Sequence, residues 1–123
     1  MGEFMDNQAI LKTVVTAADD RRAHNIEVLN IEKLSIVGRY FVIMDASSSR
    51  QVKAIADHVI DELAIQKIKV EHLEGKDQSK WILLDLGDVL VHIFTTETRE
   101  FYKLEKLWAD ATNEDISAWV TED

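Results

Sequence analysis

The amino-acid sequence predicts an α/β (α+β) fold, a single domain whose mixed, five-stranded sheet is flanked by helices. The chain has 123 residues, the usual length of one domain, and 46% of them are hydrophobic, which is enough to form a core. Some segments repeat apolar residues with the period of a helix, and others form short β-branched and aromatic runs typical of strands. These segments alternate along the chain, which indicates helices packed on one sheet.

The first third is expected to contain a helix and a hairpin. Residues 6–24 have one apolar stripe, and Asp6 suits the helix N-cap because its carboxylate accepts from free backbone amides. The stripe consists of Leu11, Val14, Val15 and Ala18. Residues 27–35 alternate weakly and predict a strand, and residues 39–45 predict a buried strand, with Gly38 in the turn between them.

A second helix is expected after Ser48. Ser48 and Gln51 have the spacing of a capping box, in which the two side chains satisfy free backbone amides at the helix start. The apolar face that follows consists of Val52, Ile55, Ala56, Val59, Ile60 and Leu63. Residues 68–73 predict a short strand after this helix, so the strand–helix–strand step predicts one parallel pair of strands.

The last third predicts a second hairpin and a final helix. Residues 81–84 and 89–94 form two apolar strands around a tight turn, in which Gly87 is free to take positive φ. The final helix is expected to begin at Thr96, where an acidic first turn suits the helix dipole. Its inner stripe is expected to consist of Phe101, Leu104, Leu107 or Trp108, and Ala111.

By composition the chain divides into three parts. Residues 1–4 resemble a remnant of a cloning vector, residues 5–112 carry all the expected elements, and residues 113–123 form an acidic C-terminal tail. No apolar run approaches the roughly 20 residues needed to span a bilayer, and no signal peptide is visible. A cytoplasmic protein that makes no contact with a membrane is therefore expected.

The charge balance restricts the kind of partner. The chain has 14 basic and 23 acidic residues, a formal net charge of −9. Such a charge repels phosphates, so strong direct binding of nucleic acid is not expected and a basic partner is favoured. The sequence has no cysteine, which excludes disulfides, thiolate metal sites and cysteine nucleophiles. Its four glycines are too far apart to build a phosphate-binding loop.

Few residues are candidates for catalysis. Asp45, Asp85 and Asp88 each lie near a strand end, where paired carboxylates can hold Mg²⁺ for nucleotidyl transfer. Aspartate is also favoured in turns because its side chain bonds local amides, and this structural interpretation is preferred. The serines at 47–49 allow either an anion site or a simple helix cap. His92 is expected to be a hydrogen-bonded strand residue, and no metal or cofactor site is predicted.

Two apolar residues suggest a protein interface. Trp81 opens a strand directly after a polar loop, and Leu86 is expected at the tip of the following hairpin. Exposed tryptophan and leucine side chains are typical anchors of protein interfaces, and the alternative is that both fold back onto the last helix. If they are exposed, the free protein is expected to hide them, most simply in a symmetric homodimer.

Residues 81–111 carry a longer and more specific signal. They contain W-I-L-L-D-L-G-D-V-L-V-H-I-F, followed by R-E-F-Y-K-L-E-K-L-W. These segments closely resemble the Iojap-related ribosome silencing factor family. Residues 40–43, 47–52 and 74–75 match the same family in order, so residues 5–112 are expected to be a ribosome silencing factor domain.

The resemblance implies a nucleotidyltransferase-like fold without catalysis or a cofactor. It also implies that the protein binds large-subunit ribosomal protein number fourteen, blocks joining of the ribosomal subunits and represses translation when nutrients are scarce. The acidic balance suits such a basic partner. A working nucleotidyltransferase needs a glycine-serine turn and two carboxylates on one strand. Here Ala46 and Ser47 stand at that turn, and a turn separates Asp85 from Asp88.

The partner-binding surface is expected to be a rim that joins Trp81 and Leu86 to residues of the last helix. Tyr102 and Glu105 are the candidates there, because both fall off the inner stripe of that helix. Tyr102 offers apolar area with a polar tip, and Glu105 suits a basic partner. Two other functions stay open: a divergent metal-dependent nucleotidyltransferase built on the three aspartates, and a general homodimeric scaffold.

Overall fold

A mixed sheet of six strands forms the centre of the computed structural model, which describes residues 6–34 and 38–121. The strands are β1 (His24–Asn30), β2 (Tyr40–Ala46), β3 (His72–Glu74), β4 (Trp81–Asp85), β5 (Val89–Thr95) and β6 (Thr112–Asn113). They lie in the order β3-β4-β5-β2-β1-β6, with β2 and β5 parallel and the other neighbouring pairs antiparallel. The mixed sheet is confirmed, and β6 adds a strand to the five predicted.

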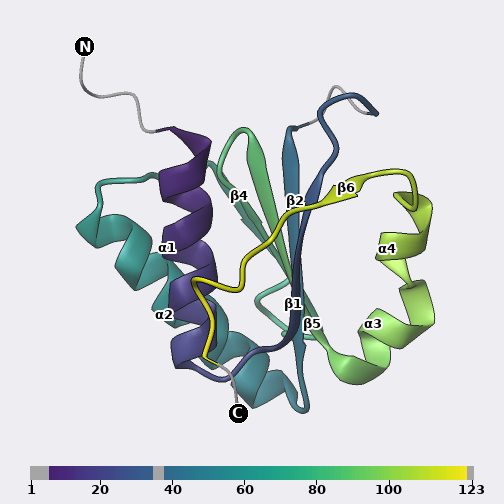
Figure 1. Ribbon diagram of the computed structural model, residues 1–123. Helices are drawn as coiled ribbons and strands as arrows, with labels where there is room; N and C mark the ends of the chain where they lie inside the picture. The colour runs from purple at the N-terminus through teal and green to yellow at the C-terminus, as the bar shows by residue number, and fades with distance from the viewer. Residues whose placement is uncertain (1–5, 35–37, 122–123) are drawn as a thin grey trace.

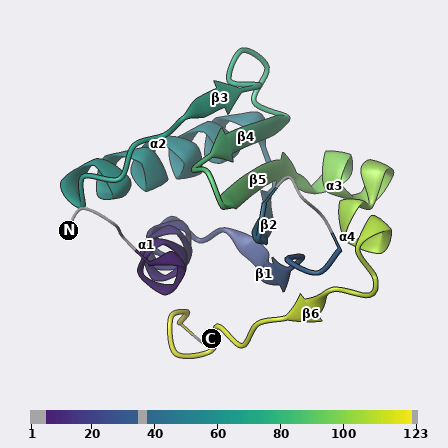
Figure 2. The ribbon, with the colours of Figure 1, turned by 90° about the horizontal axis from the view of Figure 1, so that it is seen from above.

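Helices cover both faces of this sheet (Figures 1 and 2). They are α1 (Asn7–Asp20), α2 (Ser49–Ile65), α3 (Thr96–Tyr102) and α4 (Leu104–Leu107). On one face α1 and α2 lie side by side, whereas α3 and the single-turn α4 lie on the other. Within the described parts of the chain, no helix is long and apolar enough to cross a bilayer.

Both predicted helix caps are present. The Asp6 carboxylate accepts a hydrogen bond from the Ala9 amide at 2.8 Å. The Ser48 hydroxyl accepts one from the Gln51 amide at 3.2 Å. The second half of the expected capping box differs, because the Gln51 side chain accepts from the Ser47 hydroxyl at 3.2 Å. Local side-chain chemistry therefore determines where α1 and α2 begin.

Strand alternation sends successive side chains into two separate cores. The first core lies under α1 and α2 and takes from β2 and β5 the residues Val42, Met44, Ala46, Val89, Val91 and Ile93. The second core lies under α3 and α4 and contains Leu29, Ile31, Phe41, Ile43 and Phe94. Both faces of β2 and β5 are thus buried, which explains the continuous apolar runs that predicted them.

The parallel pair is not the one predicted. The strand–helix–strand step points to a partner within residues 68–73, but the only strand near them is the three-residue β3, at the edge of the sheet. All three residues of β3 are exposed, so this strand does not suit a central position. The strongly apolar β5 takes that position beside β2 instead.

The bounds of the first strand also differ from the prediction. β1 begins three residues earlier than expected, at His24, and ends at Asn30. The expected strand extends to residue 35, which lies outside the described residues. The predicted vector remnant at residues 1–4 lies outside them as well.

The predicted last helix is divided in two. α3 ends at Tyr102, and Lys103 takes a left-handed conformation (φ 50°, ψ 51°) that interrupts the helical path before α4. Arg99 occupies the buried side of α3, so Phe101, two positions later, points away and is exposed. The placement of Phe101 in the inner stripe is therefore wrong. The members of the stripe that do pack on the second core are Leu104, Trp108 and Ala111, and the Leu107 side chain lies outside the described part.

After α4 the chain crosses the edge of the sheet and returns to α1 (Figure 1). β6 pairs with β1, and the Glu114 amide donates to the Val28 carbonyl at 2.8 Å. Three apolar residues of this segment pack against the first core: Ile116, Trp119 and Val120. The Asp19 carboxylate of α1 accepts from the amide and the hydroxyl of Thr121 at 3.0 and 2.9 Å. The acidic segment is thus attached to the body of the domain.

Leu86 is buried, which corrects the expectation of an exposed side chain at the hairpin tip. It is 7% exposed and belongs to the first core, as do Ile82 and Leu84. Alternate residues of a strand share a face, so Leu86 continues the side of β4 that faces α1 and α2. The exposed tip of the turn is formed by Gly87 and Asp88.

Replacing Leu86 with alanine is expected to destabilise the fold. Removing a buried leucine side chain leaves a cavity, and the free energy of unfolding should fall by about 2 kcal/mol. Chemical denaturation followed by circular dichroism measures the change. Ile65→Ala is the control, because Ile65 at the end of α2 is 70% exposed and its truncation should change stability by less than about 0.5 kcal/mol. Equal stabilities of the two variants would contradict the burial of Leu86.

Candidate functional site

Aromatic side chains gather on the sheet face that α3 and α4 cover in part. The strand register brings Trp81 of β4 opposite Phe94 of β5, with 4.9 Å between the ring centroids. Tyr102, at the end of α3, packs against Trp81 with a centroid distance of 5.0 Å. Phe41 of β2 and His92 of β5 extend the cluster, with 4.8 Å between their rings. The cluster therefore joins three strands to α3.

Three aromatic residues reach the surface here, and we call them the aromatic ridge: Trp81, Phe101 and Tyr102. Phe101 and Tyr102 are 79% and 53% exposed, and their rings meet edge to face at 5.0 Å. Trp81 is half-buried and connects this pair to the cluster beneath. Adjacent exposed aromatic side chains are typical anchors of protein interfaces. The ridge is thus the candidate functional site of this structure.

The structure brings together two of the four residues predicted to bind a partner. Trp81 packs against Tyr102, as the alternative in which it folds back onto the last helix predicts, and the residue is half-buried. Leu86 lies at the other end of β4 and on its opposite face, and is not part of this surface. The Glu105 side chain lies outside the described part, although its backbone belongs to α4. The sequence analysis did not identify Phe101 as a surface residue, because the predicted inner stripe assumed one continuous helix.

His92 supports the ridge from the sheet. Its Nδ1 accepts a hydrogen bond from the indole Nε1–H of Trp81 at 3.0 Å, which fixes the orientation of the indole. Burial lowers the pKa of His92 to about 4, so the imidazole is neutral at pH 7. The interpretation of His92 as a hydrogen-bonded strand residue is confirmed.

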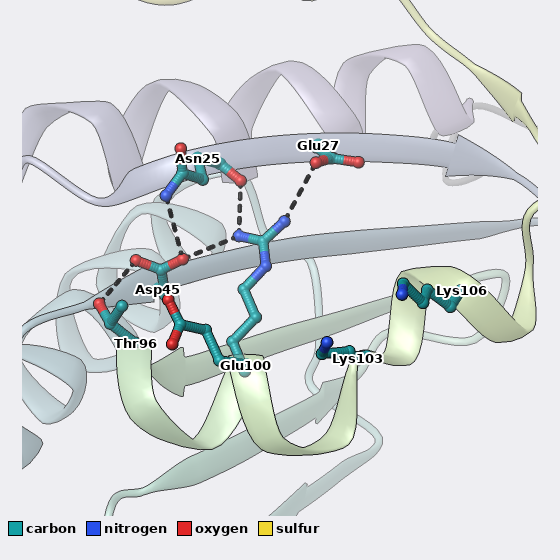
Figure 3. A pocket seen from close by; sticks show the side chains of 8 residues that line it. Asn25, Glu27, Asp45, Thr96, Glu100, Lys103 and Lys106 are labelled. Carbon is teal, nitrogen blue, oxygen red and sulfur yellow. Dashed lines mark hydrogen bonds and ion pairs between the residues drawn. The ribbon is translucent and has the colours of Figure 1, made fainter.

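A buried charge network holds α3 beside this cluster (Figure 3). Asp45, at the end of β2, and Arg99 of α3 are 2% and 6% exposed, and the Arg99 guanidinium donates to the Asp45 carboxylate at 3.1 Å. Arg99 also donates to the Asn25 carbonyl at 2.7 Å and to the Glu27 carboxylate at 3.2 Å, both on β1. The Thr96 hydroxyl donates to Asp45 at 2.9 Å. These side chains border a pocket of about 350 Å³.

Of the three aspartates considered for metal binding, Asp45 lies apart from Asp85 and Asp88. Asp45 is the second-last residue of β2, and the strand register places it at the level of Trp81, where β4 begins. Asp85 ends β4 and therefore lies at the opposite end of the sheet, with Asp88 after it. The Asp85 carboxylate accepts from the Gly87 amide at 2.9 Å, as a turn aspartate does. The turn interpretation of Asp85 is confirmed, and a nucleotidyltransferase site built on these three residues is contradicted.

The α+β fold and the aromatic ridge define a protein with a surface suited to binding another protein. Comparison with known proteins identifies its family. The family model described as "Ribosomal silencing factor during starvation" matches residues 5–123. The chain therefore belongs to this family of ribosomal silencing factors, and the resemblance found in its sequence is confirmed.

Individual relatives agree with this assignment. "Ribosomal silencing factor RsfS" of Bacillus subtilis is 44% identical over 112 residues, which cover 91% of this chain and 95% of that protein. "Protein Iojap, chloroplastic" of Zea mays is 39% identical over 100 residues, 81% of this chain and 43% of that protein. A crystal structure of a Chromobacterium violaceum protein is similar with a TM-score of 0.83 and 32% identity, covering 85% of this chain and 88% of that one. The silencing-factor names denote regulation rather than catalysis.

The buried imidazole of His92 should make stability depend on pH. Its pKa is lower in the folded state, so its stabilisation is complete above the ordinary value of 6.5 and is lost as pH falls toward 4. At about 1.4 kcal/mol per pH unit, the loss is at most about 3 kcal/mol. His92→Gln, which keeps an acceptor for Trp81, should lose less stability than the wild type between about pH 7 and about pH 4.5. Denaturant unfolding measures this, and parallel pH curves for the two proteins would contradict it.

Proposed function

We propose that this protein binds large-subunit ribosomal protein number fourteen through the aromatic ridge and so blocks joining of the ribosomal subunits. The observation that carries the proposal is the exposed pair of Phe101 and Tyr102 beside Trp81. Its relatives are named ribosomal silencing factors, which supports a ribosomal target. Occupying a subunit surface is sufficient to prevent joining, so the function needs no chemical step. It would repress translation in the cytoplasm when nutrients are limiting.

The chemistry of the ridge favours a protein partner over RNA. The N–H group of Trp81 is already bonded to His92, so the indole offers mainly apolar area, and Tyr102 adds a ring with a polar tip. The chain has a formal net charge of −9, which repels ribosomal RNA and attracts a basic protein. Glu105, in the helix after the ridge, is proposed as a contact for basic residues of the partner.

The surface can extend beyond the ridge along the same face of the sheet. α3 packs chiefly on β2 and β5, and on β4 it reaches Trp81, so the rest of this face of β3 and β4 has no described helix over it (Figure 2). Leu83 of β4 is paired with His92, lies on this face of the sheet and is half-buried. A partner seated on the ridge would bury Leu83 together with the open side of Trp81. The interface would then have an apolar centre and a charged rim, the usual arrangement in protein complexes.

Truncating the ridge should abolish binding without unfolding the protein. Phe101→Ala combined with Tyr102→Ala removes exposed side chains that are not part of either core. Loss of a central anchor costs about 2 kcal/mol of binding or more, which is about thirtyfold in Kd. Co-sedimentation with purified large subunits measures binding, and a subunit-joining assay measures silencing. Wild-type activity in the folded double variant would place the interface elsewhere.

Two controls isolate the role of the ridge. Ile65→Ala removes an exposed apolar side chain at the end of α2, on the other face of the sheet, and should bind large subunits as the wild type does. Ribosomal RNA freed of protein should bind weakly, because the negative charge of the chain opposes the phosphates. Tight, salt-sensitive binding to that RNA would contradict docking through a ribosomal protein.

We also propose that the free protein covers its ridge in a symmetric homodimer. Exposed aromatic side chains are stabilised by burial, and a two-fold dimer is the simplest closed assembly that buries the same patch on both chains. Light scattering at high micromolar concentration should give about twice the mass of one chain for the wild type. The Phe101→Ala, Tyr102→Ala variant should be a monomer. A monomeric wild type would refute the dimer and leave the ribosomal target unaffected.

A further inference from the structure

We infer that Arg99, Asp45 and Glu27 form a positioning clamp that sets the place of the aromatic ridge on the sheet. The inference rests on the proposed function, because it concerns the surface through which the partner would be bound. Arg99 is buried and acts on a partner only through α3, the helix that carries Phe101 and Tyr102.

The first argument is that α3 has little apolar packing of its own. A surface helix is normally held by a continuous apolar stripe on its inner side. In α3, a helix of 7 residues, the one buried residue is the charged Arg99. The position of the helix therefore depends on the bonds of that side chain to an unusual degree.

The second argument is the geometry of those bonds, which reach two strands at once (Figure 3). The Nη1 group of Arg99 donates to Asp45 on β2 at 3.1 Å, and the Nη2 group donates to Glu27 on β1 at 3.2 Å. Because the guanidinium is planar, anchors on two strands fix its direction as well as its position. Asp45 also accepts from Thr96, the first residue of α3. The helix is thus tied to the sheet at both Thr96 and Arg99.

The backbone of α3 connects the restrained Arg99 to the ridge residues Phe101 and Tyr102. The Arg99 carbonyl accepts a hydrogen bond from the Lys103 amide at 2.8 Å, which closes the last turn of α3 with Lys103 in the left-handed conformation. Phe101 and Tyr102 lie inside this closed turn. The direction in which their rings project therefore follows from the place of Arg99.

The pocket beside the clamp explains why these bonds are needed. It has a volume of about 350 Å³, and the clamp residues line it. Side chains that face such a space have fewer close neighbours to resist a shift of the helix. A buried ion pair adds little net stability compared with apolar residues, and in some proteins it serves instead to favour one arrangement over others. The clamp would thus select a single position of α3 and of the ridge.

The test removes the clamp without leaving a buried charge unpaired. Asp45→Leu combined with Arg99→Met replaces the ion pair with apolar side chains of similar size, an exchange that usually preserves stability. The background carries Trp108→Phe and Trp119→Phe, so that Trp81 is the only one left of the 3 tryptophans and its emission reports the contact with Tyr102. We expect shifted Trp81 emission, about tenfold weaker co-sedimentation with large subunits and a nearly unchanged unfolding midpoint.

Arg99→Lys is the second variant, for use if the double replacement does not fold. Lysine keeps the positive charge, but its single ammonium group does not reproduce the planar fork that spans Asp45 and Glu27. Its emission and binding should lie between those of the background protein and those of the double variant. Arg39→Met is the matched control, because it breaks the exposed Arg39–Asp88 ion pair at 3.8 Å, at the opposite end of the sheet from Trp81, and should change neither readout.

The outcomes separate the clamp from the proposed function. Unchanged emission in either folded variant would overturn the clamp. Shifted emission with unchanged binding would support the clamp and place the partner-binding surface away from the ridge. If the wild-type protein fails to sediment with large subunits, the proposed function fails. Trp81 emission still shows in that case whether Arg99 and Asp45 position the ridge.

Discussion

The parallel pairing of β2 with β5, buried on both faces, is the constraint on which the rest of the structure depends. Side chains alternate along a strand, so each of these strands contributes to two cores at once. The first core is aliphatic and is closed by the long helices α1 and α2. The second is aromatic in part and is closed by a short segment, Leu104 of α4 with Trp108 and Ala111 after it. Because the second face is covered less completely than the first, the candidate functional surface lies on the second face.

The candidate site arises because the second face is covered incompletely. α3 is too short to bury the aromatic cluster, and its own aromatic residues, Phe101 and Tyr102, extend the cluster to the surface. Polar groups hold this arrangement in place. His92 fixes the indole of Trp81, and Arg99 ties α3 to the strands behind it. Buried polar contacts therefore give a rigid base to an apolar surface, which reduces the entropy lost on binding.

The carboxylates at the strand ends show how residues typical of catalysis can have structural roles. Asp45 neutralises Arg99 and accepts from Thr96, and Asp85 bonds the turn at Gly87. The sheet register keeps these two aspartates at opposite ends of the molecule. The relatives are named as silencing factors, which denotes regulation, and this agrees with structural rather than catalytic roles for the two aspartates.

The sequence by itself determined the elements that depend on neighbouring residues: the helix caps at Asp6 and Ser48, the β4–β5 hairpin, the apolar faces and the family resemblance. The tertiary structure decided the parallel partner of β2, the burial of Leu86 and the break after α3. It also paired Arg99 with Asp45, which lies 54 positions earlier in the chain. The physical reason is that local patterns report which face of an element is apolar. Which element covers that face depends on contacts between distant segments, which periodicity does not encode.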